Sequence, residues 1–202
     1  MYTIRPNKLM LLFYRKALWR VKNSGKKIYL TFDDGPHPEI TNRVLDILKE
    51  YKAKATFFCV GENVRKCPDV YNRMLAEGHS TGNHTYNHAS GWRTKTARYI
   101  ENIKKCAELV DSKLFRPPYG RMKPSQYSII NKQYSIVMWD VLSGDFDQKI
   151  TKEKCLKNVL DYSREGSIVL FHDSIKAKAN MQFALPIFLK QFSEKGFVFE
   201  KL

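Results

Sequence analysis

Short apolar runs alternate with longer segments of helical periodicity from residue 26 to the end of the chain. Runs such as residues 55–60 are almost uninterrupted, which is typical of strands buried on both faces. The longer segments repeat apolar residues every three or four positions, which indicates helices with one core-facing stripe. The predicted strands are residues 28–32, 55–60, 79–84, 114–118, 135–139, 167–172 and 197–201. The predicted helices are residues 40–48, 70–75, 100–110, 124–133, 151–163 and 181–194.

This alternation predicts an α/β fold in which helices cover a parallel sheet. With about seven strands, closure into a barrel is favoured over an open sheet, while 202 residues are few for a full eight-unit barrel. We therefore expect one domain, a reduced or distorted barrel. In such folds the chemistry lies at the carboxyl ends of the strands.

Residues 1–24 precede this pattern and contain a basic amphipathic segment. Lysines and arginines there alternate, at helical spacing, with Leu9, Leu12, Phe13 and Trp19. The apolar run 9–13 is shorter than a signal-peptide core, which needs about 7–15 residues, and far shorter than a membrane span. The segment has two interpretations: an entry helix packed across the base of the domain, or peripheral membrane contact through residues 9–22. We favour packing, because apolar helix faces are usually buried.

The composition is strongly basic, with 35 lysines and arginines against 20 aspartates and glutamates and a formal net charge of +15. Such a charge attracts anions, including nucleic acid, anionic lipid and acidic polymers. The basic residues are spread along the chain and no nucleic-acid-binding motif accompanies them. We therefore expect a basic solvated surface and no nucleic-acid function. The protein is also expected to be a monomer.

The cysteines show no C-x-x-C pair, which excludes zinc-finger and zinc-ribbon spacing. They are Cys59, Cys67, Cys106 and Cys155. We expect reduced thiols, although two disulfides also fit the sequence. Reduced thiols and the missing signal-peptide pattern favour a location in the cytoplasm or at the inner membrane surface.

Candidate chemistry begins at Asp33 and Asp34, which follow the first predicted strand and precede the turn signal Gly35-Pro36. Adjacent carboxylates repel each other, so structure alone does not favour the pair. The pair suits a site in which one carboxylate binds a metal ion and the other accepts a proton. Neighbouring side chains on a strand face opposite ways, so both can serve one site only where the strand ends.

Two histidines after the third predicted strand, His84 and His88, are candidate nitrogen ligands. On a helical turn their rings would lie about 5–6 Å apart on one face, a spacing that suits chelation. The H-x3-H pattern alone also occurs by chance on surfaces. A nearby carboxylate completes a set that suits zinc or another divalent transition metal. His79 is expected to be a structural histidine, and His37 is assigned no role.

Four motifs extend this constellation along the chain. They are T-F-D-D-G-P at residues 31–36, G-N-H-T-x-x-H at 82–88, R-P-P-Y-G at 116–120 and L-F-H-D at 170–173. In this order and spacing they resemble the polysaccharide deacetylase family, also called the NodB-homology domain or carbohydrate esterase family 4. The resemblance covers residues 28 to about 200. It implies a distorted (β/α)7 barrel, of NodB-homology type, over residues 25–202.

The resemblance also implies roles for individual residues. The family's metal ligands, which usually hold Zn²⁺ and alternatively Co²⁺, Ni²⁺ or Mn²⁺, match Asp34, His84 and His88. Asp33 matches the catalytic base, and Arg116 matches the arginine that holds this base. Tyr119 matches the tyrosine whose backbone N–H helps to bind the oxyanion.

The acid side of the site is matched by His172, with Leu170 lining the pocket for the acetyl methyl group. The family often has an Asp-Trp pair, and this sequence instead has Asp145 followed by Phe146. We expect Asp145 to be the carboxylate partner of His172 and Phe146 to replace the tryptophan on the wall of the site. Asp147 is the alternative partner of His172.

The implied reaction removes N-acetyl groups from N-acetylglucosamine-containing glycans, such as peptidoglycan or chitin-type oligosaccharides. Two alternatives keep the site: an O-acetyl esterase acting on a polysaccharide, and a deacylase of a small or lipid-linked sugar. A non-catalytic carbohydrate-binding domain is a different class, which the complete set of matched residues disfavours. The family is largely exported or envelope-associated, which differs from the location that the sequence favours.

Overall fold

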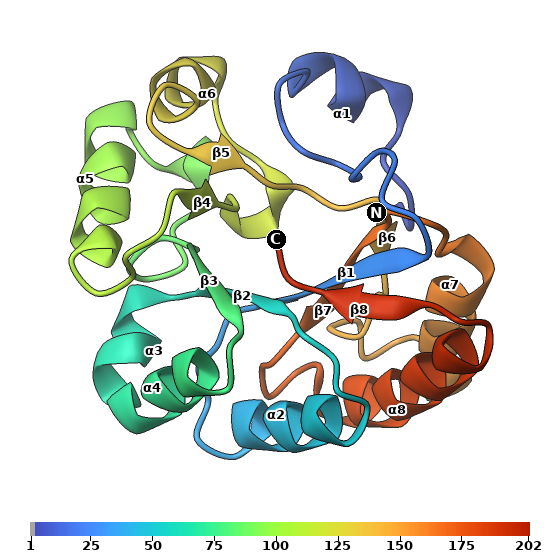
Figure 1. The fold of residues 1–202 in the computed structure, drawn as a ribbon. Helices are drawn as coiled ribbons and strands as arrows, with labels where there is room; N and C mark the ends of the chain where they lie inside the picture. Colours follow the sequence, from blue (N-terminus) through green and yellow to red (C-terminus); the bar gives the residue numbers. More distant parts are fainter. Residues whose placement is uncertain (1–2) are drawn as a thin grey trace.

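A parallel sheet of eight strands curls into an incomplete barrel with helices around it, as Figure 1 shows for the computed structural model, which describes residues 3–202. The strands are β1 (Lys27–Asp33), β2 (Thr56–Cys59), β3 (Ser80–Asn83), β4 (Leu114–Phe115), β5 (Ser135–Ile136), β6 (Val141–Leu142), β7 (Ile168–His172) and β8 (Val198–Glu200). The helices are α1 (Lys8–Phe13), α2 (Ile40–Glu50), α3 (Gly61–Lys66), α4 (Pro68–Ala76), α5 (Thr96–Ala107), α6 (Pro124–Ile130), α7 (Lys152–Tyr162) and α8 (Lys178–Glu194), with short 3-10 turns η1 (Gly91–Arg93) and η2 (Pro118–Gly120). The predicted barrel is confirmed.

The strand order is β5-β4-β3-β2-β1-β7-β6, with β8 paired to the first half of β1. All these pairs are parallel, so the carboxyl ends of the strands meet at one end of the barrel. The register aligns Asp33 of β1 with His172 of β7. The two strands therefore deliver these residues to the same place.

Side chains of β1 alternate between two environments, as the strand period requires. Leu30 and Phe32 belong to the main core, and the ring of Phe32 stacks on that of Phe57 with centroids 5.1 Å apart. Thr31 and Asp33 face the other way and contact the buried Arg116. One strand thus supplies the core with one face and the site with the other.

The barrel is open between β5 and β6, the two ends of the strand order. The chain after α1 runs along this opening, where Leu18 forms a bridge with Val137 and Arg20 forms one with Ser167. The hydroxyl of Tyr14 anchors the segment, since it donates to the Met122 carbonyl and accepts from the Met122 N–H, both at 3.0 Å. The N-terminal segment thus lies in the gap of the sheet.

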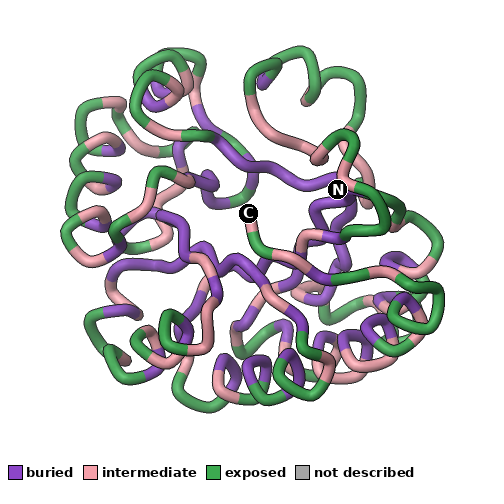
Figure 2. The backbone as a smooth tube through the Cα atoms, in the orientation of Figure 1, coloured by how far each residue is buried: buried purple, intermediate pink, exposed green. Residues whose placement is uncertain are grey.

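The N-terminal segment packs on the domain mainly through the residues that follow α1, and the apolar face of the helix itself is largely exposed. Figure 2 shows most of α1 exposed, and the helix contributes no buried residue. Leu9, Leu12 and Phe13 keep 60%, 62% and 61% of their surface exposed. The helix ends at Phe13, and the residues after it extend along the opening of the barrel, where Tyr14 and Trp19 pack against the core.

Three local features also differ from the sequence-based expectations. The helix α3 and the strand β6 are additional elements, so Asp145 follows β6. Residues 84–88 do not form a helical turn, because Thr85 and His88 have φ of 66° and 55°.

All four cysteines are free, as expected. Among residues 3–202, no helix is both long and apolar enough to cross a bilayer.

Candidate active site

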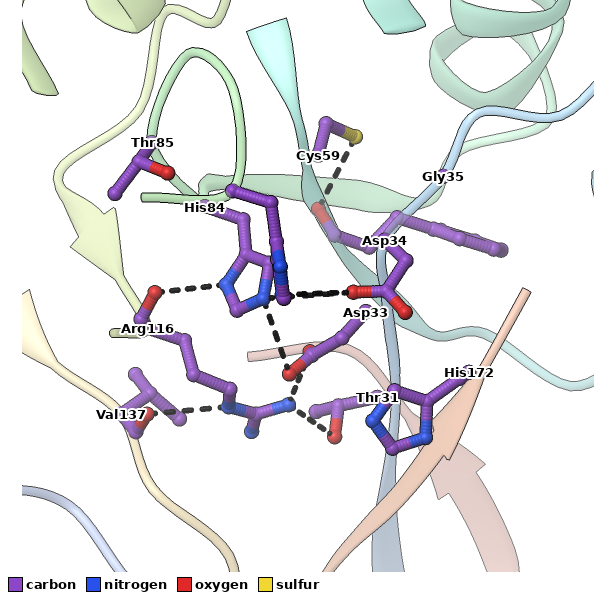
Figure 3. A network of polar contacts seen from close by, with 12 residues as sticks. Thr31, Asp33, Asp34, Gly35, Cys59, His84, Thr85, Arg116, Val137 and His172 are labelled. Atoms are coloured by element: carbon purple, nitrogen blue, oxygen red, sulfur yellow. Dashed lines mark hydrogen bonds and ion pairs between the residues drawn. The ribbon is translucent and has the colours of Figure 1, made fainter. Parts of the chain in front are cut away.

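The two adjacent aspartates lie on a sharp turn at the end of β1. Asp34 has φ of 86°, a left-handed conformation that is uncommon for a residue with a side chain. The turn is fixed from outside, because the Asn63 amide donates to the Asp34 carbonyl at 2.7 Å and the Val60 N–H donates to the Gly35 carbonyl at 2.9 Å. By turning the chain here, the fold directs both carboxylates toward one site (Figure 3).

The rings of His84 and His88 lie with their centroids 5.1 Å apart, within the expected range although the backbone is not helical. The Nδ1 of His84 is 2.8 Å from the Arg116 carbonyl, which can only accept, so Nδ1 carries the proton. Burial lowers the pKa of His84 to about 4 despite the charge of Asp33. His84 is therefore neutral, with a free lone pair on Nε2.

Asp34, His84 and His88 offer ligand atoms that all lie within 4.8 Å of one another. The Oδ1 of Asp34 is 3.2 Å from His88 Nε2 and 3.8 Å from His84 Nε2. Burial alone would raise the pKa of Asp34, but the contact with His88 and the neighbouring histidines hold this pKa below its usual value. The carboxylate therefore stays ionised.

The donor set fits a divalent transition metal. Asp34 Oδ1 is buried without a hydrogen-bond partner among residues 3–202, which is costly for a charged oxygen unless a cation satisfies it. Two imidazole nitrogens and one carboxylate oxygen are the protein ligands of many catalytic zinc sites, which leave further positions for water and substrate. These residues can hold one such ion.

Arg116 is fully buried and binds Asp33 directly. Its NH1 donates to Asp33 Oδ1 and to Thr31 Oγ1, each at 2.8 Å, and its Nε donates to the Val137 carbonyl (Figure 3). Its NH2 donates to the Met138 carbonyl. The Oδ2 of Asp33 lies 3.7 Å from His84 Nε2. One carboxylate oxygen is thus tied to the arginine, while the other faces the metal-binding cluster.

His172, at the end of β7, is held by Asp145 at two atoms. Its Nδ1 is 2.8 Å from Asp145 Oδ1, and its backbone N–H donates to Oδ2 at 2.7 Å. Burial lowers the pKa of His172, but the charge and hydrogen bond of Asp145, with Asp34 and Asp33, outweigh burial and raise the pKa to about 9. His172 is therefore protonated at neutral pH, with its Nε2 proton free of Asp145.

Four other residues were singled out from the sequence. The ring of Phe146 meets that of His172 edge-on, with centroids 5.0 Å apart. Tyr119 has φ of 62°, and its exposed ring makes an edge contact with His88 at 4.7 Å between centroids. Leu170 is buried on β7, two positions before His172, and Asp147 accepts from the Lys149 N–H at 3.0 Å.

Two buried polar residues were given no role by the sequence. Asp173 accepts from the Gly35 N–H at 2.9 Å and from the Thr41 hydroxyl, so it ties the end of β7 to the aspartate turn. Thr31 shares a face of β1 with Asp33 and accepts from Arg116. The period-two spacing was a usable signal for Thr31, whereas the contacts of Asp173 depend on the sheet register.

The remaining histidines lie outside the cluster. His79 is buried, and its Nδ1 accepts from the Ala55 N–H at 3.2 Å, as expected for a structural histidine. Burial lowers its pKa to about 4. His37 accepts from the N–H groups of Glu39 and Ile40 at the start of α2.

Comparison with known proteins places this arrangement in a known group. The family described as polysaccharide deacetylase matches residues 20–134. A peptidoglycan-N-acetylglucosamine deacetylase of Bacillus cereus is 37% identical over 73% of this chain, and a second is 34% identical over 90%. The chain spans 56% of the length of the first and 88% of the second. A chitooligosaccharide deacetylase of Azorhizobium caulinodans is 34% identical over 76% of the chain and 77% of its own length.

Solved structures agree with these sequences. The crystal structure of the Bc1960 peptidoglycan N-acetylglucosamine deacetylase, bound to an N-hydroxybenzamide, superimposes with a TM-score of 0.88 at 32% identity, over 98% of this chain and 95% of its own. The peptidoglycan deacetylase PdaC from Bacillus subtilis gives a TM-score of 0.80 at 31% identity, over 90% of each chain. The curled sheet and its helices are therefore shared with these enzymes.

Proposed function

This chain belongs to the polysaccharide deacetylase family, and we propose that it is a metal-dependent hydrolase that removes N-acetyl groups from N-acetylglucosamine-containing glycans. The observation that carries the proposal is the position of Asp33. Its Oδ1 is held by Arg116, and its Oδ2 faces the cluster of Asp34, His84 and His88. A protonated histidine, His172, lies at the aligned position of the neighbouring strand.

We propose Zn²⁺ as the bound ion, held by Asp34, His84 and His88, with Co²⁺, Ni²⁺ and Mn²⁺ as substitutes. The donor set of two imidazoles and one carboxylate supports a metal of this class. When bound, such an ion supplies Lewis-acid activation of water and of the acetamide carbonyl. The hydrogen bond from His84 Nδ1 to Arg116 fixes the ring so that Nε2 faces the ion.

In the first step, Asp33 Oδ2 accepts a proton from the water that attacks the acetyl carbon. Arg116 fixes the rotamer of Asp33, because its guanidinium donates a charge-assisted hydrogen bond to Oδ1 at 2.8 Å. The backbone N–H of Tyr119 would stabilise the negative charge that develops on the carbonyl oxygen. Leu170 would receive the acetyl methyl group.

In the second step, the C–N bond breaks and the electron pair goes to the sugar nitrogen. An amine leaves poorly as an anion, so His172 Nε2 donates its proton to the nitrogen as the bond breaks. Asp145 orients the ring and stabilises its charged form, and Phe146 covers its edge. The products are acetate and the free amino sugar.

Three expectations from the sequence stay predictions: the domain boundary at residue 24, the monomeric state and the location of the protein. The relatives named for peptidoglycan act in the cell envelope, which supports an envelope substrate for this chain as well. The predicted location in the cytoplasm or at the inner membrane surface is the alternative.

Acetate release by the metal-reconstituted protein tests the function. The substrates would be chitin oligomers, peptidoglycan, acetylated xylan and small acylated sugars, assayed with and without chelator. We expect release from the N-acetylated glycans, abolished by the chelator. Release from xylan alone would assign an O-acetyl esterase instead, and metal binding without any release would assign a binding domain. His84→Ala should lower both metal content and activity.

A further inference from the structure

An apolar cavity of about 650 Å³ lies between α1 and the loop that follows β4. Its walls include Leu9, Phe13, Tyr14, Trp92, Tyr119 and Trp139. Tyr119 also contacts His88, so the cavity adjoins the candidate active site. The charged residues that line it are Arg121 and Lys123, and no carboxylate lines it within residues 3–202.

The rim of this cavity is apolar and exposed. Leu9 and Phe13 on α1 are 60% and 61% exposed, and Trp92 and Tyr119 on the opposite side are 56% and 64% exposed. Leu12, on the same helix, is 62% exposed. We call these five side chains the α1 surface: four of them line the cavity beside the site, and Leu12 lies about one helical turn from Leu9 on α1. Exposed apolar areas commonly mark an interaction with a protein or a membrane.

The charged side chains of α1 and of the segment that follows it have one sign. Every charged side chain in residues 1–32 is a lysine or an arginine. Lys8, Arg15 and Lys16 are exposed, and none of them takes part in an ion pair among residues 3–202. A second copy of the chain would bring the same charge to the contact, which opposes self-association. A partner that is both anionic and apolar is complementary to the basic charge and to the exposed apolar side chains.

We propose that the α1 surface binds an anionic phospholipid bilayer. Leu9, Leu12 and Phe13 enter the boundary between headgroups and acyl chains, while Lys8, Arg15 and Lys16 contact the headgroups. Trp92 and Tyr119 have an apolar ring with a polar edge, the chemistry that favours the same boundary. The contact turns the mouth of the active site toward the membrane, where glycans close to the bilayer are within reach.

Co-sedimentation of the whole protein with vesicles tests this surface. The vesicles are phosphatidylcholine alone and phosphatidylcholine mixed with phosphatidylglycerol. We expect binding to the mixed vesicles, weakened by salt, and much less binding to phosphatidylcholine alone. Leu12→Asp and Phe13→Asp should each weaken binding by about tenfold, equivalent to about 1.4 kcal/mol. Both side chains are mostly exposed, so the variants should unfold at the wild-type temperature.

Leu75→Asp is the matched control, because Leu75 is a 46% exposed leucine on α4, away from the α1 surface. This variant should bind vesicles like the wild type. Equal binding of Leu12→Asp, Phe13→Asp and wild type would overturn the proposal, as would failure of the wild type to bind the mixed vesicles. Dimers that dissociate in the two α1 variants would assign the surface to a second copy. The assay contains no glycan, so its outcome is independent of the deacetylase activity.

Discussion

At the scale of single residues, the site depends on a buried charge that makes four hydrogen bonds. Arg116 is fully buried, and its guanidinium donates to Asp33, to Thr31 and to the carbonyls of Val137 and Met138. Burial lowers the pKa of Arg116, and the charge of Asp33 opposes this shift. A buried arginine with this many acceptors holds one rotamer, so it fixes which oxygen of Asp33 is available for proton transfer.

Asp33→Asn tests whether Asp33 and Asp34 have different roles. The amide keeps the size of the side chain but cannot accept the proton from water, so we expect turnover to fall by about 10²–10⁴-fold or more. Asp34, His84 and His88 are unchanged, so the purified variant should bind metal like the wild type. Metal content by elemental analysis and acetate release check this. Loss of metal from the variant would make Asp33 a ligand.

The pH dependence of the rate should follow the protonation of His172. Its pKa is raised to about 9, so the acid form is present at neutral pH and is lost as the pH rises through this value. The His172–Asp145 pair therefore stabilises the fold fully below about pH 6.5, and this contribution disappears as the pH rises through about 9. The charge of Asp34 is one cause of the raised pKa of His172, and a cation bound to Asp34 would offset it. We therefore expect the rate to fall with rising pH at or below about pH 9.

Asp145→Asn should move this alkaline limb to lower pH by about 1–3 units, because it removes the charge that favours imidazolium. Profiles of kcat against pH for the metal-loaded proteins measure the shift. Asp161→Asn, at an exposed position on α7, serves as the control and should keep the wild-type profile. An unchanged limb in Asp145→Asn would show that another group supplies the proton.

At the scale of elements, the turn after β1 and the end of β7 form one unit. Asp173 accepts from the Gly35 N–H and from Thr41, while Asp33 and His172 align in the sheet. Burial raises the pKa of Asp173 to about 7, against the hydrogen bond from Thr41. The distance between the proposed base, Asp33, and the proposed acid, His172, is therefore set by two strand ends that are hydrogen-bonded to each other, rather than by flexible loops.

Gly35→Ala should damage this unit. The added methyl group would overlap the Asp173 carboxylate, so the turn or Asp173 must move. We expect the free energy of unfolding to fall by about 1–3 kcal/mol and metal affinity to fall with it. Gly25→Ala is the control, because its methyl group meets nothing, although its φ of 64° still costs about 1–2 kcal/mol. Urea unfolding measures the two losses of stability, which overlap, and metal titration distinguishes the variants, because only Gly35→Ala should weaken metal binding. Normal metal affinity in Gly35→Ala would contradict the expectation.

At the scale of the whole molecule, one sheet joins the proposed metal ligands to the core. These ligands follow β1 and β3, the two neighbours of β2 in the sheet, so an ion between them would link separate parts of the chain. The open side of the barrel lies elsewhere, between β5 and β6, and is lined by the N-terminal segment. Binding at the site should therefore stabilise the whole domain.

Removal of the metal should lower the thermal midpoint. A ligand at 100 times its Kd stabilises the folded state by about 2.7 kcal/mol, which corresponds to roughly 5–10 °C for a chain of this size. Calorimetry with and without chelator measures the difference, and re-addition of Zn²⁺ should restore it. His84→Ala should show little response to either treatment. A wild-type midpoint that is independent of metal would argue against the three-residue site.

The sequence by itself determined the type of fold and the chemistry of the site. Apolar periodicity is a local property, so it identified most strands and helices, and the motifs at strand ends contained Asp33, Asp34, His84 and His172. The tertiary structure decided what depends on residues distant in sequence: the left-handed turn at Asp34, the oxygen of Asp33 that Arg116 holds, and the two atoms of His172 that the expected partner Asp145 binds. It also decided that α1 is exposed, whereas the segment that follows the helix lies along the barrel opening. Local patterns show which faces are apolar, and only the packed chain shows which of them are covered.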